Sequence, residues 1–340
     1  MFSQKIFRTS AMVAALALSV PSTLAASDPQ PVKLSGQEAA KGVTTVAIGA
    51  FNVGFIFKSV DQTKAVGGFM GLAEGTTRAE SSLVGVSPAV MQQITDAAYA
   101  DFVTQLRAKG YAVQDPAVTF AGGAADKMHP QKAPLDINIQ LEKKSNGKAT
   151  FFKPTVLPAM LIMAGDFTGS GMSSIGLSMA AGQTSYALTQ YAKTSGMAVI
   201  DVTYLIDFSD QKRPGSFSMG SLKINSGISV ASNYSRVSMI APSGKTAVIK
   251  LNQPIPVEGD FATMRDTTSG SAKAVETAGH VAGGIGRLMG GKLGGLGMFG
   301  RGGNTRKIEF DAKPENYAAG ATKAASLANI QMVATLFSLR

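Results

Sequence analysis

One stretch of the chain has the apolar spacing of a helix that packs against a core along one side. Ser87 is a good N-cap residue, Pro88 suits the first helical position, and Gly110 follows as a terminator. The spacing of three and four residues predicts a helix over residues 88–109. The residues that make this apolar stripe are Met91, Ile94, Ala98, Phe102 and Leu106.

Two other segments alternate between apolar and polar residues, which is the period of a β-strand. Residues 135–142 alternate without a break, so we expect a strand with one face in water. Residues 197–208 alternate in the same way and predict a second strand with a polar, wet face. Its apolar face holds Ile200, Val202, Tyr204, Ile206 and Phe208, and its polar face holds Asp201, Thr203 and Asp207.

The remaining pattern is less regular. Residues 58–85 are small and polar, which indicates either a mobile loop or a weak hairpin. Asp311 and Pro314 precede an Ala-rich stretch that predicts a final helix over residues 314–339. Further strands rich in Val, Ile, Phe and Tyr are expected at residues 44–57, 111–115, 222–230 and 245–251, the last two as neighbours in a hairpin or meander around Ser243-Gly244.

Together these elements predict an α+β fold with an α/β nucleus: a mixed, largely antiparallel sheet with one helix packed near 88–109 and another at the C-terminus. The segments that we expect along the chain are a signal peptide (1–26), a flexible lead-in (27–42), an α/β subdomain (43–150), a low-charge insertion rich in Gly, Ser and Met (151–196), a β-rich part of the same sheet (197–265), a Gly-rich segment (266–307), and a final strand and helix (308–340).

The insertion at 151–196 has two interpretations. Its charged residues are Lys153, Asp166 and Lys193, while glycine, proline and serine interrupt every apolar run. The run from 156 to 164 is too short to span a bilayer as a helix. The segment is therefore either a buried crossing of the core or a loop that touches a membrane.

The N-terminus has the pattern of a cleavable export signal. Lys5 and Arg8 precede a short apolar run from 11 to 20, and Pro21 and small residues follow. The apolar run is about half the roughly 20 residues that a membrane-spanning helix needs. A buried N-terminal helix is the alternative. We expect cleavage after Ala25 or Ala26 and function outside the cytoplasm.

Cysteine is absent from the chain, which favours a bacterial periplasmic or cell-surface protein over a disulfide-stabilised secreted domain. Acylation of an N-terminal cysteine is chemically excluded, so we do not expect a lipoprotein. The formal net charge of +10 becomes +8 once Lys5 and Arg8 are removed with the signal. This charge favours an envelope protein or an anionic envelope surface as partner, or it serves solubility alone. No run of five basic residues and no tryptophan occur, so we expect no nucleic-acid partner.

The segment from 277 to 303 is rich in glycine. A lone helix there is disfavoured, because each glycine costs about 0.5–1 kcal/mol relative to alanine. Small residues four apart allow close approach of a second backbone, so one interpretation is an interfacial or oligomer-forming element over 279–303. The other is a flexible linker. The candidate membrane or oligomer contacts are Gly286, Gly290, Gly294, Arg287 and Lys292.

The same segment matches the phosphate-loop spacing GxxxxGK from Gly286 to Lys292. Leu293 stands where a hydroxyl is needed to hold magnesium, and no strand pattern precedes the motif. We therefore interpret the match as chance in a glycine-rich chain and expect no nucleotide and no cofactor.

Residues for catalysis and metal binding are sparse. His129 and His280 are the two histidines, and they do not have the spacing of a metal site. A serine triad would have to recruit one of them, and no GxSxG nucleophile motif is present. We predict no catalytic, cofactor-binding or metal residues. The acidic residues Asp201, Asp207 and Asp210 either form a patch that holds calcium or acts in acid–base chemistry, or are the wet side of an amphipathic strand.

A resemblance to a known family rests on the order of three segments. A first strand at 45–51, a helix that ends in QLRAKGYAVQD, and the later strand AVIDVTYLIDFSD resemble the α/β nucleus of the curli-secretion-channel family and of related periplasmic envelope-assembly domains. The resemblance implies a helix against a mixed sheet and a hairpin after the later strand, and it carries over no catalytic residue. The chain lacks the acylated cysteine of the channel members, and no clear pair of membrane hairpins is visible.

These observations predict an exported bacterial envelope protein that acts by binding or assembly and is not an enzyme. One alternative is a membrane-active or self-associating protein, including a homo-oligomer, that uses residues 279–303. A second is a hydrolase of an envelope polymer that uses Asp207, Asp210 or His129.

Overall fold

The computed structural model describes residues 30–66, 74–142, 145–167, 173–212, 223–268 and 305–340. The chain divides at position 30 into two units, and all the helices and strands described below belong to the unit Pro31–Arg340. The predicted signal peptide and residues 269–304 of the glycine-rich segment lie outside the described residues.

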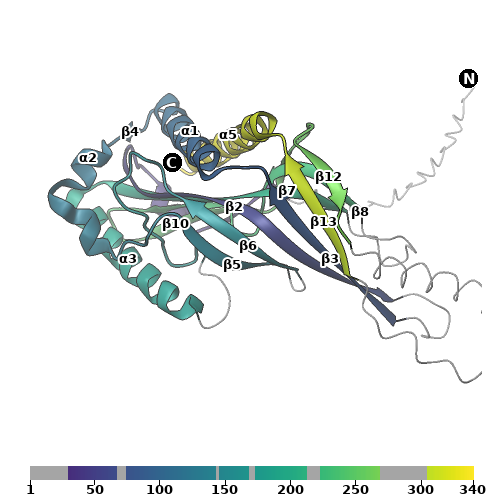
Figure 1. Ribbon diagram of the computed structural model, residues 1–340. Helices are drawn as coiled ribbons and strands as arrows, with labels where there is room; N and C mark the ends of the chain where they lie inside the picture. The colour runs from purple at the N-terminus through teal and green to yellow at the C-terminus, as the bar shows by residue number, and fades with distance from the viewer. Residues whose placement is uncertain (1–29, 67–73, 143–144, 168–172, 213–222, 269–304) are drawn as a thin grey trace, which may run out of the picture. The chain divides into compact units, whose positions relative to one another are not determined.

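One mixed sheet of 13 strands forms the centre of the second unit, with β2 and β7 running parallel through its middle (Figure 1). The pairs β2–β4 and β3–β13 are also parallel, and the other described pairs are antiparallel. The predicted α+β fold with a mixed, largely antiparallel sheet is therefore confirmed. The main path of the sheet contains eight strands, in the order β1 (Val32–Ser35), β10 (Thr246–Leu251), β9 (Arg236–Ile240), β7 (Ala198–Lys212), β2 (Thr45–Val66), β3 (Glu74–Val84), β13 (Thr305–Ala312) and β12 (Ala262–Asp266). Five further strands pair beside this path: β4 (Ala112–Val113), β5 (Leu135–Glu142), β6 (Ser145–Phe152), β8 (Lys223–Val230) and β11 (Ile255–Val257).

Helix α1 (Pro88–Ala108) begins and ends within one residue of the predicted bounds. The Ser87 side chain accepts a hydrogen bond from the Val90 N–H, and Pro88 occupies the first turn, so both start signals act as expected. All five residues of the predicted apolar stripe are buried. The helix forms where it does because capping and burial of one face act together.

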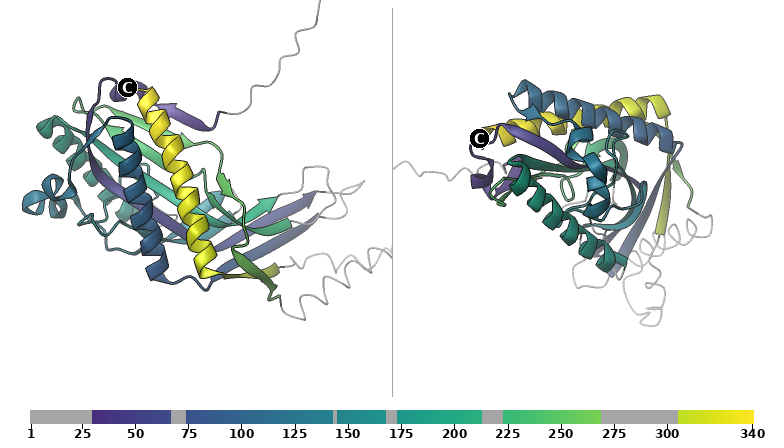
Figure 2. Two further views of the ribbon diagram at one scale, coloured as in Figure 1. Left: turned by 90° about the horizontal axis from the view of Figure 1, so that it is seen from above. Right: turned by 90° about the vertical axis from the view of Figure 1, so that its left-hand side faces the viewer.

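Helices α1 and α5 (Pro314–Ser338) lie side by side on one face of the sheet, which we call the α1/α5 face (Figures 1 and 2). Phe51 of β2 meets the rings of Tyr99, Phe102 and Tyr204 edge to face, at centroid distances of 5.5–6.0 Å. Aromatic pairs in this arrangement contribute about 0.5–1.5 kcal/mol beyond the area that they bury. The packed C-terminal helix was predicted from sequence.

The opposite face of the sheet is covered by α3 (Ser173–Ser195) and by the loop of residues 153–167, and we call it the α3 face (Figure 2). The loop agrees with the buried-crossing interpretation of the insertion, because most of its large apolar side chains are buried, although Val156 is 55% exposed. The buried ones are Leu157, Met160, Leu161, Ile162, Met163 and Phe167. Shorter helical elements are η1 (Gln37–Ala40), α2 (Pro116–Thr119) and η2 (Ala121–Met128).

Three sequence predictions need correction or completion. For residues 58–85 the hairpin alternative is the one that holds, since β2 continues to Val66 and pairs antiparallel with β3, which begins at Glu74. The hairpin expected between 222–230 and 245–251 is wrong, because β10 pairs with β9 around Gly244 while β8 pairs with β7 and β11. Helix α3 and strands β6 and β9 were not predicted.

Several long strands end at the same end of the sheet. The pairing registers place the last residue of β2 beside the first of β3, and the last of β7 beside the first of β8. β5 with β6, and β12 with β13, are oriented in the same way. The two described ends that each pair must connect therefore lie at one end of the sheet in all four pairs. In the pair β12 and β13, the residues between these two ends include the glycine-rich segment.

Candidate functional site

The acidic candidates of β7 do not form one site. Asp201 is fully buried, so the interpretation of its strand face as wet is wrong at this position. The face is polar, but α3 and the loop of residues 153–167 cover it, and alternation alone does not distinguish water from a covering segment. Asp207 lies six residues further along the strand, about 20 Å away at roughly 3.3 Å per residue. It is half-buried and close enough to Tyr317 for its charge to raise the pKa of that phenol, in addition to the larger effect of burial.

Asp210 pairs with Asn225 through the backbone of β7 and β8, and its side chain lies outside the described residues. The candidate contacts in the glycine-rich segment, Gly286, Arg287, Gly290, Lys292 and Gly294, lie outside them as well, as does His280. Among the described residues, Asp201 meets partners that were not sequence candidates for this site.

These partners are Asp166 of the covering loop and Arg236 of β9. The Arg236 Nε lies 2.7 Å from Asp166 Oδ1, and both side chains are almost completely buried. The Arg236 Nη2 donates to the Ala164 carbonyl oxygen at 2.9 Å, and Asp166 Oδ2 accepts from the Met163 N–H at 2.7 Å. The guanidinium thus holds the loop to the sheet by an ion pair and a backbone hydrogen bond.

Gly165 makes this contact sterically feasible. Its φ is +90°, which favours glycine, and a Cβ at this position would lie 2.4 Å from Arg236 Nη1. The sequence Ala164-Gly165-Asp166 therefore lets the loop backbone turn tightly over the guanidinium and present the carboxylate to it.

Neutral polar side chains extend the cluster across three strands. Asn52 of β2, Thr203 of β7 and Arg236 of β9 are in register, and Asp201 is in register with Ser238. We call Asn52, Asp166, Asp201, Thr203, Arg236 and Ser238 the buried polar layer. The buried atoms Asn52 Oδ1, Thr203 Oγ1 and Ser238 Oγ have no hydrogen-bond partner among the described protein atoms.

Burial decides the charge state of this layer. Desolvation raises the pKa of Asp201 well above its ordinary value, and the neighbouring Asp166 carboxyl raises it further, against the opposing charge of Arg236. Burial also raises the pKa of Asp166, while Arg236, the Met163 N–H and a hydrogen bond from Asp201 counteract the rise. Asp201 therefore keeps a proton and donates it to an Asp166 carboxylate that faces Arg236.

This arrangement can hold a proton and fasten a loop, but the reactive groups are closed to solvent. A substrate in solution does not reach a carboxyl that is 0% exposed. Within the described part of the chain, no group of three or more His, Cys, Asp or Glu side chains comes together as a metal site. The layer is therefore a poor candidate for a catalytic centre.

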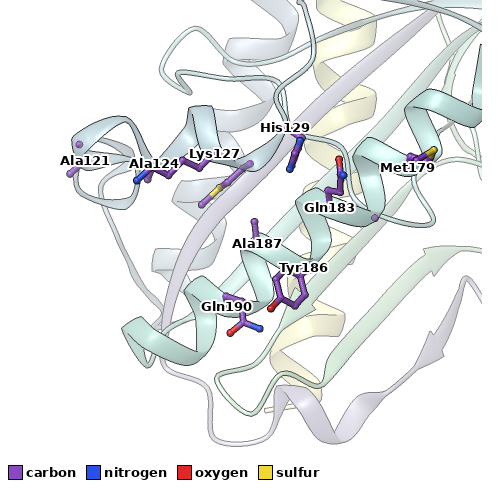
Figure 3. Close-up of a pocket in the computed structure, with 12 residues that line it drawn as sticks. Ala121, Ala124, Lys127, His129, Met179, Gln183, Tyr186, Ala187 and Gln190 are labelled. Carbon is purple, nitrogen blue, oxygen red and sulfur yellow. The ribbon is translucent and has the colours of Figure 1, made fainter.

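An accessible groove lies on the outer side of the same covering layer, between η2 and α3 (Figure 3). Its volume is about 810 Å³. Lys127 and His129 lie on the η2 side, while Met179, Gln183 and Tyr186 extend from α3 (Figure 3). The described lining consists of apolar, small and amide side chains with these two basic ones, and it contains no carboxylate.

The local sequence explains how both walls form. Gly122 and Gly123 have positive φ angles of 65° and 73°, so η2 kinks within one short segment. His129 then ends η2 with a φ of 54°, a conformation uncommon outside glycine. The Thr184 hydroxyl of α3 donates to the Met128 carbonyl oxygen at 2.6 Å, which joins the two walls.

Helix α3 has two different sides. Its inner side packs on the sheet through Ala181, Leu188 and Ala192, all at most 1% exposed. Its outer side leaves Ile175, Met179 and Tyr186 exposed by 57%, 65% and 68%. The sole charged residue of the helix is Lys193. Exposed apolar side chains beside a groove mark an interaction surface more often than an ordinary solvated helix.

Sequence analysis found Asp201 and His129 but missed Asp166, Arg236 and the outer side of α3. Asp166 was visible as a lone acid in a low-charge segment, which is the one signal that pointed to it. Arg236 and Asp201 are 35 residues apart, and nothing in the linear pattern joins them.

Comparisons with family models, curated proteins and solved structures find no match to this chain. Among the described helices, none combines the length and apolarity that a membrane-spanning segment requires.

Proposed function

We propose that this chain is an exported bacterial envelope protein that acts by binding another protein through the groove between η2 and α3. The observation that carries the proposal is the exposure of Ile175, Met179 and Tyr186 beside an open groove of about 810 Å³. A partner that covers large exposed apolar side chains is stabilised by roughly 25 cal/mol per Å² of apolar surface removed from water.

The chemistry of the lining favours one kind of occupant. Lys127 and His129 are the basic side chains of the described lining, and no carboxylate faces them across the groove. A partner segment that combines aliphatic or aromatic side chains with Asp or Glu therefore fits better than a basic one, because charge complementarity favours binding and like charges oppose it. We assign an acidic, amphipathic peptide segment of another protein to the groove.

Export is supported by the residues of the N-terminus alone. Lys5, Arg8 and the apolar run that follows have the order of a secretory signal, and the absence of cysteine fits a bacterial envelope protein. Fractionation of cells that express the full chain tests this part. Recovery mainly in the cytoplasm contradicts it, whereas recovery of a shortened chain in the periplasm or at the outer-membrane periphery supports it.

The binding part is tested with a peptide-display library panned against the mature chain. We expect the enriched peptides to combine aromatic or aliphatic residues with Asp or Glu. The same peptides should bind at least tenfold more weakly to Met179→Ser and Tyr186→Ser variants, and Lys127→Glu should shift the preference toward basic peptides. Fluorescence anisotropy with labelled peptides measures each affinity.

Ile330→Ser is the matched control, because Ile330 is an exposed apolar residue of α5, 49% exposed, on the other face of the sheet. Binding should survive this change. Enriched peptides that bind the Tyr186→Ser variant as well as the original chain would show that the groove is not the docking site.

A second candidate function is self-association or membrane binding through residues 279–303. The observation that favours it is topological: the described strands that flank this segment end where three other strand pairs also end. The described ends of these four strand pairs therefore lie at the same end of the sheet as the two ends that flank residues 279–303.

Replacement of Gly286, Gly290 and Gly294 by leucine tests this candidate. The expected result is loss of oligomers or of binding to anionic vesicles, measured by size determination with and without detergent and by vesicle co-sedimentation. Unchanged size and sedimentation reject it. The peptide experiment above is independent of this outcome, since its variants lie on α3.

A further inference from the structure

A continuous set of contacts joins the outer helix of the groove to the buried polar layer. The Ser185 hydroxyl of α3 accepts a hydrogen bond from the Ala164 N–H at 2.8 Å. The Ala164 carbonyl oxygen in turn accepts from Arg236, which faces Asp166. Asp166 and Asp201 form a side-chain hydrogen bond. Four contacts therefore connect the wall of the groove with a carboxyl on the central strand.

The charges of the layer balance only when it holds a proton. Asp166 and Asp201 carry two negative charges when both are ionised, and Arg236 supplies one positive charge. The side chains of all three are closed to water, so an excess negative charge cannot be solvated in place. One proton shared by the two carboxyls makes the layer neutral.

We propose that the proton shared by Asp166 and Asp201 locks helix α3 against the sheet, and that its release to solvent at alkaline pH frees α3 and opens the groove wall. The opening of the groove wall matters for binding only if the function proposed above is correct. The release of α3 from the sheet does not depend on any partner.

The groups that face Asp201 explain why a rise in pH, and not a fall, should release α3. The covering loop presents Asp166, β9 presents Arg236 and Ser238, and β2 presents the neutral Asn52 in the adjacent row. Helix α3 faces the loop with neutral Ser185, and its one charged residue, Lys193, lies against Gly244 instead. The charge that opposes ionisation of Asp201 is that of Asp166, and Arg236 alone cannot neutralise both carboxylates.

When the proton leaves Asp201, two carboxylates repel each other in a dry site. Hydration of Asp201 relieves this repulsion only if the loop moves off β7. Ala164 belongs to that loop and holds Ser185, so movement of the loop removes one of the attachments of α3. A second hydrogen bond, from Thr184 to the Met128 carbonyl oxygen, joins α3 to η2 and not to the sheet, and the apolar packing of Ala181, Leu188 and Ala192 then remains.

Hydrogen exchange of the mature chain at pH values from about 5 to about 9 tests the proposal without any partner. Protection factors are compared, since they already correct for the intrinsic effect of pH on exchange. One linked proton changes the opening equilibrium by up to tenfold per pH unit. We expect protection of the α3 amides to fall by up to tenfold per unit as the pH rises, to values below those of α5.

Asp201→Asn is the matched variant, because it keeps the shape of the side chain and cannot ionise. Its α3 amides should stay protected across the whole range. Ser185→Ala cuts the connection elsewhere: α3 should be less protected at every pH, and its dependence on pH should be weaker. Asp207→Asn, on the same strand but about 20 Å away at roughly 3.3 Å per residue, should behave like the original chain.

Two results would overturn the proposal. One is α3 protection that does not change with pH in the original chain. The other is an Asp201→Asn variant whose α3 amides lose protection with pH as the original does. Should Asp201→Asn fail to fold, the Ser185→Ala and Asp207→Asn variants still give the comparison. Loss of peptide binding in Tyr186→Ser leaves the exchange of the rest of α3 unchanged, so failure of the groove function and failure of the lock are separate outcomes.

Discussion

Strand β7 carries a buried polar cluster on each of its two faces, and the two clusters are built differently. On the α1/α5 face, the Tyr204 hydroxyl donates to Asn329 Oδ1 at 2.9 Å. Asn329 Nδ2 then donates to the Ala98 carbonyl oxygen at 2.9 Å and to Asp101 Oδ2 at 2.8 Å. On the α3 face, the buried polar layer contains two carboxyls and a guanidinium, and the side-chain oxygens of Asn52, Thr203 and Ser238 lack partners among the described protein atoms.

The difference shows how one strand can serve stability and control at once. The Tyr204–Asn329 pair is neutral, and burial raises the pKa of Tyr204 well above its usual value, so this pair does not titrate near neutral pH. The buried polar layer is neutral only with a proton bound. We therefore call the α1/α5 face the invariant half of the core, because its buried Tyr204–Asn329 pair keeps the same charge as the pH changes. We call the α3 face the responsive half, because the charge of its buried polar layer depends on pH.

The strongest way to break this comparison is Arg236→Met. The change keeps much of the side-chain volume but leaves Asp166 without its cation and Ala164 without its donor. Removal of one partner of a buried ion pair costs about 3–5 kcal/mol. We expect a loss of that size in the free energy of unfolding at neutral pH, measured by urea denaturation.

The loss caused by Arg236→Met should shrink at acid pH, because two protonated carboxyls no longer need a cation. At neutral pH the free energy of unfolding of Arg236→Lys should lie between those of the original chain and Arg236→Met, since lysine keeps the charge but cannot contact Asp166 and Ala164 in the same geometry. An Arg236→Met variant as stable as the original at neutral pH would show that the ion pair does not hold the loop.

The second prediction concerns the invariant half. Asn329→Ala removes the acceptor of the buried Tyr204 hydroxyl, one buried and one partly buried hydrogen bond, for a cost of about 2–3 kcal/mol. The loss should be the same at about pH 5 and about pH 8, because the Tyr204–Asn329 pair is neutral at both values. A pH-dependent loss, measured by the same urea titrations, would contradict the division of the core into two halves.

Sequence pattern predicted the invariant half better than the responsive half. The stripe of α1, its Ser87-Pro88 start and the Ala-rich C-terminal helix follow local rules, because spacing and capping act within about one helix. Helix α3 escaped detection since Gly, Ser and Ala dominate it and its apolar face is narrow. β6 escaped as well, because its apolar residues come only at its end.

The candidate site shows the same limit. Asp201 stood out on an alternating strand, but whether its polar face meets water depends on a loop 35 residues earlier in the chain. Arg236 comes from a strand that reaches β7 only through the sheet topology. The resemblance to envelope-assembly domains, the export signal and the glycine-rich segment stay predictions.

The third prediction sharpens the contrast through pH. Because burial raises the pKa of Asp201 above the value of about 3.9 for an exposed aspartate, its contribution to stability is complete below that value and is lost as pH rises toward the raised pKa. The free energy of unfolding should fall with pH by up to about 1.4 kcal/mol per unit over this window. Asp201→Asn should remove the slope, and an equal slope in the variant would exclude Asp201 as its source.

The smallest effect on stability is expected on the outer side of α3, where the proposed function predicts the largest effect on binding. Met179→Ser and Tyr186→Ser replace side chains that are more than half exposed, so each should change the free energy of unfolding by no more than about 0.5 kcal/mol. A variant whose free energy of unfolding is unchanged but whose peptide binding is lost identifies the replaced side chain as part of the docking surface. A variant that loses both the fold and the peptide shows instead that these side chains pack in the native state, and the outer side of α3 would then belong to the core and not to a docking surface.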